Sequence, residues 1–232
     1  MAKVIEIEHL TKTYGKNRGV TDVSLDVSEG DIFGFLGPNG AGKSTTIRSM
    51  MGFLKFDSGS IRILGMDSVK DREKILTQVG YMPSEAWFYD SMKVSEVISY
   101  AADIRGIDCS EEAGKLCERL KVNTNKKIRE LSYGNKKKVS IVCAMQHKPK
   151  LFIFDEPTGG LDPLMQRSFF ELITEYVDHG ATCLLSTHVL TEVNKYCRHA
   201  AIMREGKLTM LESPKIDDEE FLKFYEETEE GA

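Results

Sequence analysis

Apolar and polar residues alternate in two different ways along this chain of 232 residues, and each pattern predicts a different kind of strand. Residues 24–27 and 60–64 alternate apolar with polar side chains, which is typical of an antiparallel sheet with one face in water. Ile32–Leu36 is a continuous apolar run, typical of a strand buried on both faces. Short apolar segments predict further strands at residues 4–7, 79–82, 151–154, 183–186, 200–203 and 207–211.

Helical periodicity follows the first buried strand and dominates the middle of the chain. Apolar residues recur with helical spacing over residues 43–54, so the local order is strand, loop and helix. Residues 92–146 show helical periodicity with almost no strand pattern, interrupted near residues 106–109 and 123–126. Asp162-Pro163 predicts another helix start, because a carboxylate caps the helix and proline is tolerated at its first position.

These patterns predict an α/β protein with a mostly parallel sheet, an N-terminal antiparallel β subdomain and an inserted helical subdomain. We expect one domain over residues 1–232. Its core comprises residues 1–85 and 148–211, its helical subdomain residues 86–147, and its acidic tail residues 212–232. The apolar residues of the tail are spaced for one face of a helix and are Phe221, Leu222, Phe224 and Tyr225.

Charge and composition narrow the classes of function. The net charge is −5, and residues 217–232 contribute −7, so the remaining body is close to +2. Neither value is the basic excess of a protein that neutralises a nucleic-acid backbone, and we expect no nucleic-acid partner. The chain lacks the ~18 continuous apolar residues of a membrane-spanning helix, and residues 3–8 carry carboxylates where a signal peptide is apolar. We therefore expect a cytoplasmic chain.

A glycine-rich segment follows Ile32–Leu36 and fits the pattern G-x-x-x-x-G-K-[ST]. Its glycines let the backbone wrap tightly and point its N–H groups inward, at a helix N-terminus whose dipole also favours anions. We expect Lys43 to reach the β- and γ-phosphates of ATP, and the Ser44 hydroxyl to ligate Mg²⁺. The residues of this phosphate-binding loop are Gly37, Pro38, Asn39, Gly40, Ala41, Gly42, Lys43, Ser44 and Thr45.

Two further strands end in side chains that suit ATP hydrolysis. Residues 151–154 deliver Asp155 and Glu156 to the carboxyl end of a strand, where parallel sheets present ligands. We expect Asp155 to hold Mg²⁺ and Glu156 to polarise the attacking water as the base. His188 follows the apolar residues 181–185 in the same way, and we expect it at the γ-phosphate or at the attacking water.

The order of these motifs resembles the nucleotide-binding subunit of ATP-binding cassette (ABC) transporters, from residue 4 to about residue 211. Residues 131–135, Leu-Ser-Tyr-Gly-Asn, stand where that family carries its Leu-Ser-Gly-Gly-Gln signature. Residues 155–162 resemble the extended Walker B motif and D-loop of the family. Tyr14 matches the aromatic residue that stacks on adenine, and His188 matches the switch histidine.

The resemblance implies that ATP is sandwiched between two cassettes, with the signature of one facing the phosphate-binding loop of the other. Ser132 and Gly134 are then implied to contact the γ-phosphate across that interface. The second cassette can be another copy of this chain, because both halves of a site are present. The resemblance also implies a separate transmembrane permease, transport in the direction of export, and a place at the inner face of the cell membrane.

Three positions depart from the family pattern. Tyr133 replaces the first glycine of the signature, and Asn135 replaces its glutamine. Ser84 stands where the family usually has a glutamine, and Glu85 follows it. A serine does not span the distance that a glutamine amide covers, so these positions leave the rate of hydrolysis open.

Two further segments are interpreted from their composition. Residues 87–89, Trp-Phe-Tyr, precede the region where the family receives a helix of the permease, and they indicate either core packing or an exposed docking groove. Residues 136–138 are three consecutive lysines, which we interpret as a solvated helix face, with a contact to acidic headgroups or a partner loop as the alternative.

Two alternatives to a transporter subunit remain open from the sequence. A non-transport ABC-type ATPase that acts on nucleic acid or the ribosome uses the same dimer, but usually brings a coiled coil, a zinc insertion or a second cassette. A phosphate-loop kinase or GTPase would lack residues 131–135, and a GTPase would need an N-K-x-D loop that this chain does not contain. The transporter subunit is therefore our main prediction.

Overall fold

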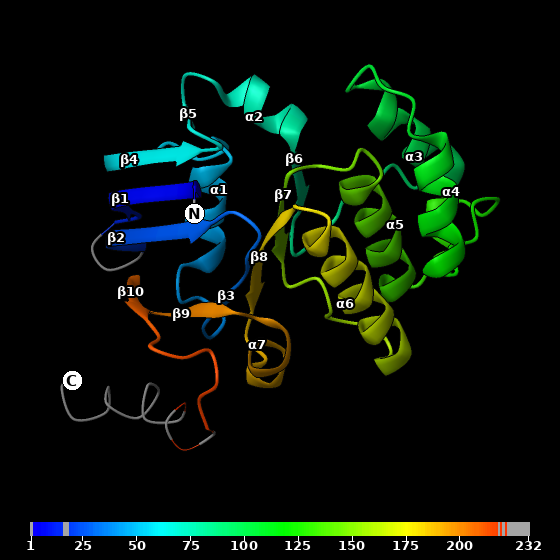
Figure 1. Cartoon of the computed structure of the whole chain (residues 1–232). Coiled ribbons are helices and arrows are strands. Elements are labelled where there is room, and N and C mark those ends of the chain that lie inside the picture. The colour runs from blue at the N-terminus through cyan, green and yellow to red at the C-terminus, as the bar shows by residue number, and fades with distance from the viewer. Residues whose placement is uncertain (1, 16–18, 218, 220, 222–232) are drawn as a thin grey trace.

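The computed structural model describes residues 2–15, 19–217, 219 and 221, and these fold into two sheets and surrounding helices (Figure 1). Figure 1 shows the antiparallel strands at one side of the molecule and helices α3 and α4 at the opposite side. The larger sheet lies between them. Among the described residues, no helix is both long and apolar enough to cross a membrane.

The smaller sheet has the strand order β2-β1-β4-β5 and is antiparallel throughout. Ile5, Ile7 and Leu25 are buried, whereas the neighbouring Glu8 and Asp26 are exposed, so one face packs inward and the other meets water. This arrangement confirms the predicted antiparallel part. Its strands are β1 (Lys3–Thr13), β2 (Gly19–Ser28), β4 (Ser58–Ile63) and β5 (Met66–Asp67).

The larger sheet has the strand order β10-β9-β3-β8-β7-β6. All neighbouring pairs are parallel except β9 and β10, which form an antiparallel hairpin. Every residue of β3 is buried, as its continuous apolar run predicts, and the mixed architecture confirms the α/β class. The strands are β3 (Ile32–Leu36), β6 (Val79–Met82), β7 (Leu151–Asp155), β8 (Thr182–Thr187), β9 (His199–Arg204) and β10 (Lys207–Met210).

The register of the parallel strands brings their carboxyl ends to one edge of the sheet. Leu36 at the end of β3 pairs with Thr187 at the end of β8. Asp155 at the end of β7 pairs with Ser186, one residue earlier in β8. The three segments that follow these strands therefore start side by side, although they are far apart in the sequence.

Helix α1 (Lys43–Met50) follows β3, as predicted, but ends four residues before the predicted end at residue 54. Gly52 adopts a φ of 65°, a left-handed conformation that suits glycine and stops a helix. The N–H groups of Gly52 and Phe53 donate to the carbonyls of Ser49 and Arg48, which closes the last turn. The helical spacing of apolar residues continues past this glycine, but the helix itself ends before it.

Helices fill the stretch predicted to be helical. They are α3 (Val94–Asp103), α4 (Ser110–Arg119) and α5 (Tyr133–Met145), with a short 3₁₀ helix η1 (Ile128–Glu130). Val142 of α5 belongs to the same buried cluster as Met82 of β6 and Phe154 of β7. Apolar burial of this kind anchors the helices on the larger sheet.

The remaining helices are α2 (Arg72–Gln78), α6 (Pro163–Asp178) and α7 (Leu190–Tyr196). Asp162 accepts hydrogen bonds from the N–H groups of Leu164 and Met165, which confirms the predicted start of α6. Towards the C-terminus, Ile216 is buried and its backbone is bonded by the side chain of Asn194. Residues 212–217 of the predicted tail form no helix. Of the four apolar residues predicted for one helix face, only Phe221 is among the described residues, and it packs against the main core.

Candidate active site

The phosphate-binding loop connects β3 to α1 and needs glycine at two positions in particular. Gly37 has a φ of 155°, and a β-carbon there would overlap the carbonyl oxygen of Met203. Gly42 has a φ of 112°, and a β-carbon there would lie 2.7 Å from Cγ1 of Val20. Both positions combine a backbone conformation rare for other residues with a close neighbour, so the loop geometry depends on the absence of side chains.

The turn between β9 and β10 supports this loop from a distant part of the chain. Its two central residues, Glu205 and Gly206, have φ values of 47° and 77°. The N–H of Gly206 donates to the carbonyl of Ala41 at 2.9 Å, and the carbonyl of Gly206 accepts from the N–H of Thr21 at 2.8 Å. The hairpin therefore joins the loop to the antiparallel sheet, a contact that the sequence patterns did not predict.

Lys43 is only 5% exposed and folds back on the loop. Its Nζ donates to the carbonyls of Gly37 at 2.5 Å and of Pro38 at 3.1 Å. It also lies 3.3 Å from Oε1 of Glu156, the residue that follows strand β7. A buried ammonium needs such partners, because desolvation without them is costly.

Asp155 is buried and joins two hydroxyl groups. Its Oδ2 accepts from the Ser44 hydroxyl at 2.7 Å, and its Oδ1 accepts from the Ser186 hydroxyl at 2.8 Å. A carboxylate and a hydroxyl are oxygen ligands of the type that Mg²⁺ prefers. The pair formed by Ser44 and Asp155 therefore fits the chemistry of the predicted magnesium site.

Glu156 has a left-handed backbone with a φ of 52°, which is uncommon for a residue with a side chain. Its N–H donates to the carbonyl of Ser186 at 2.9 Å. Its Oε2 lies 2.7 Å from Nδ1 of His188, while Oε1 faces Lys43. The carboxylate is therefore held between Lys43, the first residue of α1, and His188, which follows β8.

These residues border a hollow of about 1040 Å³, close to the range of pockets that bind small molecules. Gly37 and Ala41 of the loop are buried and do not line this hollow, and the hydrogen bonds above connect Asp155 and His188 to the lining residues. Ser84, Glu205 and Gly206 also line the hollow and were not among the predicted binding residues. The predicted residues that line it are Tyr14, Pro38, Asn39, Gly40, Gly42, Lys43, Ser44, Thr45 and Glu156.

Ser132 and Gly134 do not line this hollow, although the sequence resemblance links them to phosphate binding. Ser132 is exposed and caps α5 by accepting from the N–H of Asn135 at 3.4 Å. The ring of Tyr133 lies against Gly160 of the same chain, since a β-carbon at Gly160 would lie 2.5 Å from its Cδ1. The signature segment is therefore exposed towards the surface, away from the loop of its own chain.

Lys137 contradicts the interpretation of residues 136–138 as a solvated face. It is 3% exposed, and its Nζ donates to the main-chain carbonyl of Glu156. Burial lowers the pKa of Lys137, an effect opposed by the nearby carboxylates of Glu156, Asp155 and Glu85. The helical spacing offered a signal for this burial, because Lys137 lies one turn before the buried Ile141 on the same face of α5.

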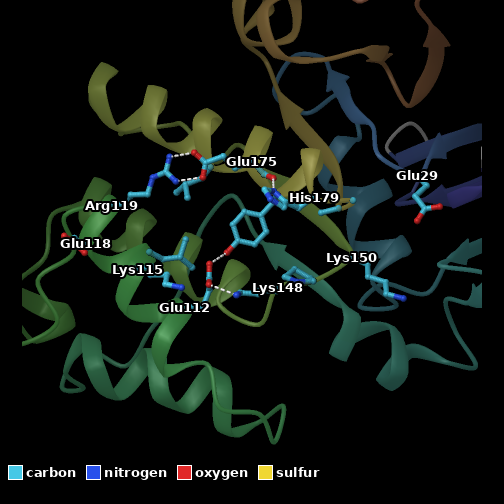
Figure 2. A pocket seen from close by; sticks show the side chains of 15 residues that line it. Glu29, Glu112, Lys115, Glu118, Arg119, Lys148, Lys150, Glu175 and His179 are labelled. Atoms are coloured by element: carbon cyan, nitrogen blue, oxygen red, sulfur yellow. Dashed lines mark hydrogen bonds and ion pairs between the residues drawn. The ribbon is translucent and has the colours of Figure 1, made fainter.

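A second hollow, of about 1010 Å³, lies between α4 and α6 (Figure 2). Figure 2 shows Arg119 paired with Glu175, and Glu112 approached by Lys148. Tyr176 also donates its hydroxyl proton to Glu112. Glutamates equal lysines and arginines in number along its walls, so this hollow has no positive excess for a triphosphate. We interpret it as a polar junction between α4 and α6.

The fold and the site define a phosphate-loop ATPase with an antiparallel sheet and an inserted helical part. Residues 20–159 match the family model described as ABC transporter. The uncharacterized ABC transporter ATP-binding protein YhaQ of Bacillus subtilis is 37% identical over 209 residues, which cover 88% of this chain and 69% of that protein. This chain belongs to the ABC transporter family, and it is an ATP-binding subunit with ATPase activity.

Other relatives agree with this assignment. The bacitracin transport ATP-binding protein BcrA of Bacillus licheniformis is 36% identical over 211 residues, which cover 90% of this chain and 69% of that protein. A solved structure described as the ATP binding subunit of an ABC transporter has a TM-score of 0.87 and 29% identity, covering 96% of this chain and all of its own. Family membership excludes the kinase and GTPase alternative.

Proposed function

We propose that this chain hydrolyses ATP in the hollow beside its phosphate-binding loop and thereby energises a membrane exporter. One observation carries the proposal: the Glu156 carboxylate lies between Lys43 and His188, at 3.3 Å and 2.7 Å, at the edge of that hollow. An acid poised between two cationic or proton-carrying groups suits the activation of water next to a phosphate.

ATP binding begins with the loop and the residues around it. The loop N–H groups and the N-terminus of α1 receive the phosphates, and the half-exposed ring of Tyr14 stacks on the adenine. Lys43 exchanges its loop carbonyls and Glu156 for phosphate oxygens, which frees the carboxylate. Ser44 and Asp155 would hold Mg²⁺, which when bound neutralises charge on the phosphates.

Hydrolysis is then an in-line attack of water on the γ-phosphorus. Glu156 orients the water and accepts its proton as the new bond to phosphorus forms, while the bond from the γ-phosphorus to the β–γ bridging oxygen breaks and ADP leaves. His188 holds the Glu156 carboxylate at its Oε2 and provides a second contact for the water or the γ-phosphate. Lys43 carries part of the negative charge that develops on the phosphate oxygens.

The site is completed by a second copy of the chain. Ser132 and Gly134 at the N-terminus of α5 do not line the hollow of their own chain, and a helix N-terminus favours anions. The Tyr133 ring contacts Gly160 of its own chain, which leaves Ser132 and the N–H of Gly134 free to meet phosphate across the interface. Two chains in this arrangement would form two equivalent sites.

A transmembrane permease is the proposed membrane partner, with this chain bound at the inner face of the cell membrane. BcrA is named for bacitracin transport, and the Escherichia coli relative YbhF for a probable multidrug transporter, which favours export of drug-like or peptide solutes. Trp87 is 88% exposed and Tyr89 77%, whereas Phe88 packs against the core. Exposed aromatic rings of this kind support the docking interpretation of this segment.

Replacement of Trp87 tests the partner proposal. Trp87→Ala is expected to reduce co-purification with a co-expressed transmembrane permease subunit, with nucleotide affinity unchanged. Val69→Ala, an exposed apolar residue near α2, is the matched control. Unchanged co-purification of the Trp87 variant would exclude this segment as the docking site.

The Glu156→Gln variant tests the catalytic proposal. Turnover should fall by about 10²- to 10⁴-fold, because the amide cannot accept the proton. ATP affinity should be kept, and sedimentation in MgATP should show an accumulated dimer in the variant. Normal turnover in Glu156→Gln would remove Glu156 from the mechanism.

A further inference from the structure

We propose that Lys137 is a positioning residue for Glu156, and that it ties the catalytic carboxylate to the signature segment of the same chain. Lys137 is not among the residues that line the hollow, and its Nζ donates to the Glu156 carbonyl, so we place its effect on Glu156. The inference rests on the proposed role of Glu156 and extends it with a second residue that no motif of the chain identifies.

Glu156 has a left-handed backbone conformation that depends on its surroundings. A left-handed residue with a side chain is strained, and it persists only where the surrounding structure holds it. Two contacts hold the Glu156 backbone: its N–H is bonded to Ser186, and its carbonyl accepts from Lys137. Both sides of the residue are therefore held, which sets the direction in which the carboxylate leaves the backbone.

Lys137 is almost fully buried. Lysines are almost never fully buried unless they are paired, and at this helix position an apolar side chain would pack at lower cost. The carbonyl of Glu156 accepts a hydrogen bond from Lys137, and the carboxylates of Glu156, Asp155 and Glu85 counteract the burial that lowers the pKa of Lys137. Its Nζ also lies 5.7 Å from the centre of the Tyr133 ring, within the range of a cation–π contact.

Lys137 lies on the same helix as the signature segment. Ser132, Tyr133, Gly134 and Lys137 belong to the first turns of one helix and move together. A β-carbon at Gly134 would overlap the carbonyl oxygen of Gly160, so this helix end packs directly on the segment that follows Glu156. A shift of α5 on contact with the nucleotide of a second copy therefore moves Lys137 and, through it, the Glu156 carbonyl.

The experiment compares Lys137→Met with Lys137→Gln and with the control Lys138→Met. Methionine keeps the length of the side chain without a donor, glutamine keeps a donor, and Lys138 is the half-buried neighbour that lies outside the site. We expect kcat of Lys137→Met to fall by about 10- to 100-fold, as for a catalytic group displaced by about 1 Å. Nucleotide affinity and KM should stay within about twofold, because the interaction serves the transition state.

Rescue separates a positioning role from a structural one. Lys137→Gln should recover at least about tenfold of the kcat lost in Lys137→Met, and Lys138→Met should match the wild type. Melting temperatures control for folding, and Lys137→Ala carries the same expectation as Lys137→Met if the latter does not fold. A folded Lys137→Met or Lys137→Ala with wild-type kcat, or a loss that Lys137→Gln does not relieve, overturns the proposal.

Glu156→Gln measured in parallel distinguishes the two proposals. Loss of turnover in Glu156→Gln with normal turnover in Lys137→Met overturns the role of Lys137 alone. Normal turnover in Glu156→Gln overturns the catalytic proposal and, with it, the positioning role.

Discussion

Nδ1 of His188 lies 2.7 Å from Oε2 of Glu156. The two residues follow different strands, β8 and β7, whose carboxyl ends are adjacent in the sheet. Glu156 is mostly buried, with 18% of its side chain exposed, while half of the His188 side chain faces solvent. The contact thus joins a fixed acid to a group that can still reach a ligand.

His188→Ala is expected to lower kcat by about 10²-fold, because the Glu156 carboxylate loses the group that orients it. Nucleotide affinity should change little, since the phosphate-binding loop is intact. Single-turnover hydrolysis and equilibrium binding of a fluorescent ATP analogue measure the two quantities. A parallel loss of affinity would show that His188 serves ground-state binding instead.

Asp155→Asn is expected to remove the magnesium dependence of nucleotide binding. Asp155 accepts from Ser44, and the neutral amide is a weaker ligand for a hard divalent cation. In the wild type, ATP with Mg²⁺ should stabilise the fold more than ATP with a chelator, by up to about 2.7 kcal/mol at a hundredfold excess over Kd. Thermal shift assays should show equal stabilisation with and without Mg²⁺ in the variant. A persisting difference would place the metal on other residues.

Gly134→Ala and Gly114→Ala form a matched pair of helix substitutions with opposite expected effects. Nothing lies within 4 Å of a β-carbon at Gly114 in α4, so this change should stabilise the protein by about 0.5–1 kcal/mol. A β-carbon at Gly134 would overlap the Gly160 carbonyl, so that change should destabilise by about 1–3 kcal/mol through overpacking. Urea denaturation of both variants checks the signs, and a stabilised Gly134→Ala would disprove the close contact.

Tyr176→Phe is expected to destabilise the junction between α4 and α6 at neutral pH by about 1–2 kcal/mol, which corresponds to a few degrees in Tm. The Tyr176 hydroxyl donates to Glu112, and burial together with this bond raises the pKa of Tyr176. Although burial works in the opposite direction, bonds from Lys148 and Tyr176 hold the pKa of Glu112 below its usual value.

The sign of the pH effect follows from Glu112. A carboxyl whose pKa is lowered by folding contributes stability above its unfolded pKa, and this is lost as the pH falls through the folded pKa. Tyr176→Phe removes one cause of the lowering, so the deficit of the variant should shrink as the pH falls below about 4. Tm measured from pH 7 to pH 3 checks this, and a deficit that grows in acid would contradict the assignment.

Local sequence determined much of the fold of this protein. The apolar runs of β3 and β7 and the alternation in β2 and β4 follow from burial on two faces or one, and each was readable from neighbouring residues. The glycine pattern of the phosphate-binding loop was equally local, because tight backbone turns exclude side chains at Gly37 and Gly42. The order of the motifs along the chain sufficed to identify the family.

Tertiary structure decided which side chains meet. The charge of Lys137 predicted a side chain exposed to solvent. Its position on the inner face of α5 instead buries it against the Glu156 carbonyl. The turn at Gly206 bonds to Ala41, 165 positions earlier, and no local pattern encodes a contact at that separation. Ser84 stands where the family usually has a glutamine, yet it lines the hollow, and the Glu85 carboxylate opposes the lowering of the pKa of Lys137 by burial. Such contacts depend on the packing of whole elements, which residue patterns along a single strand or helix do not contain.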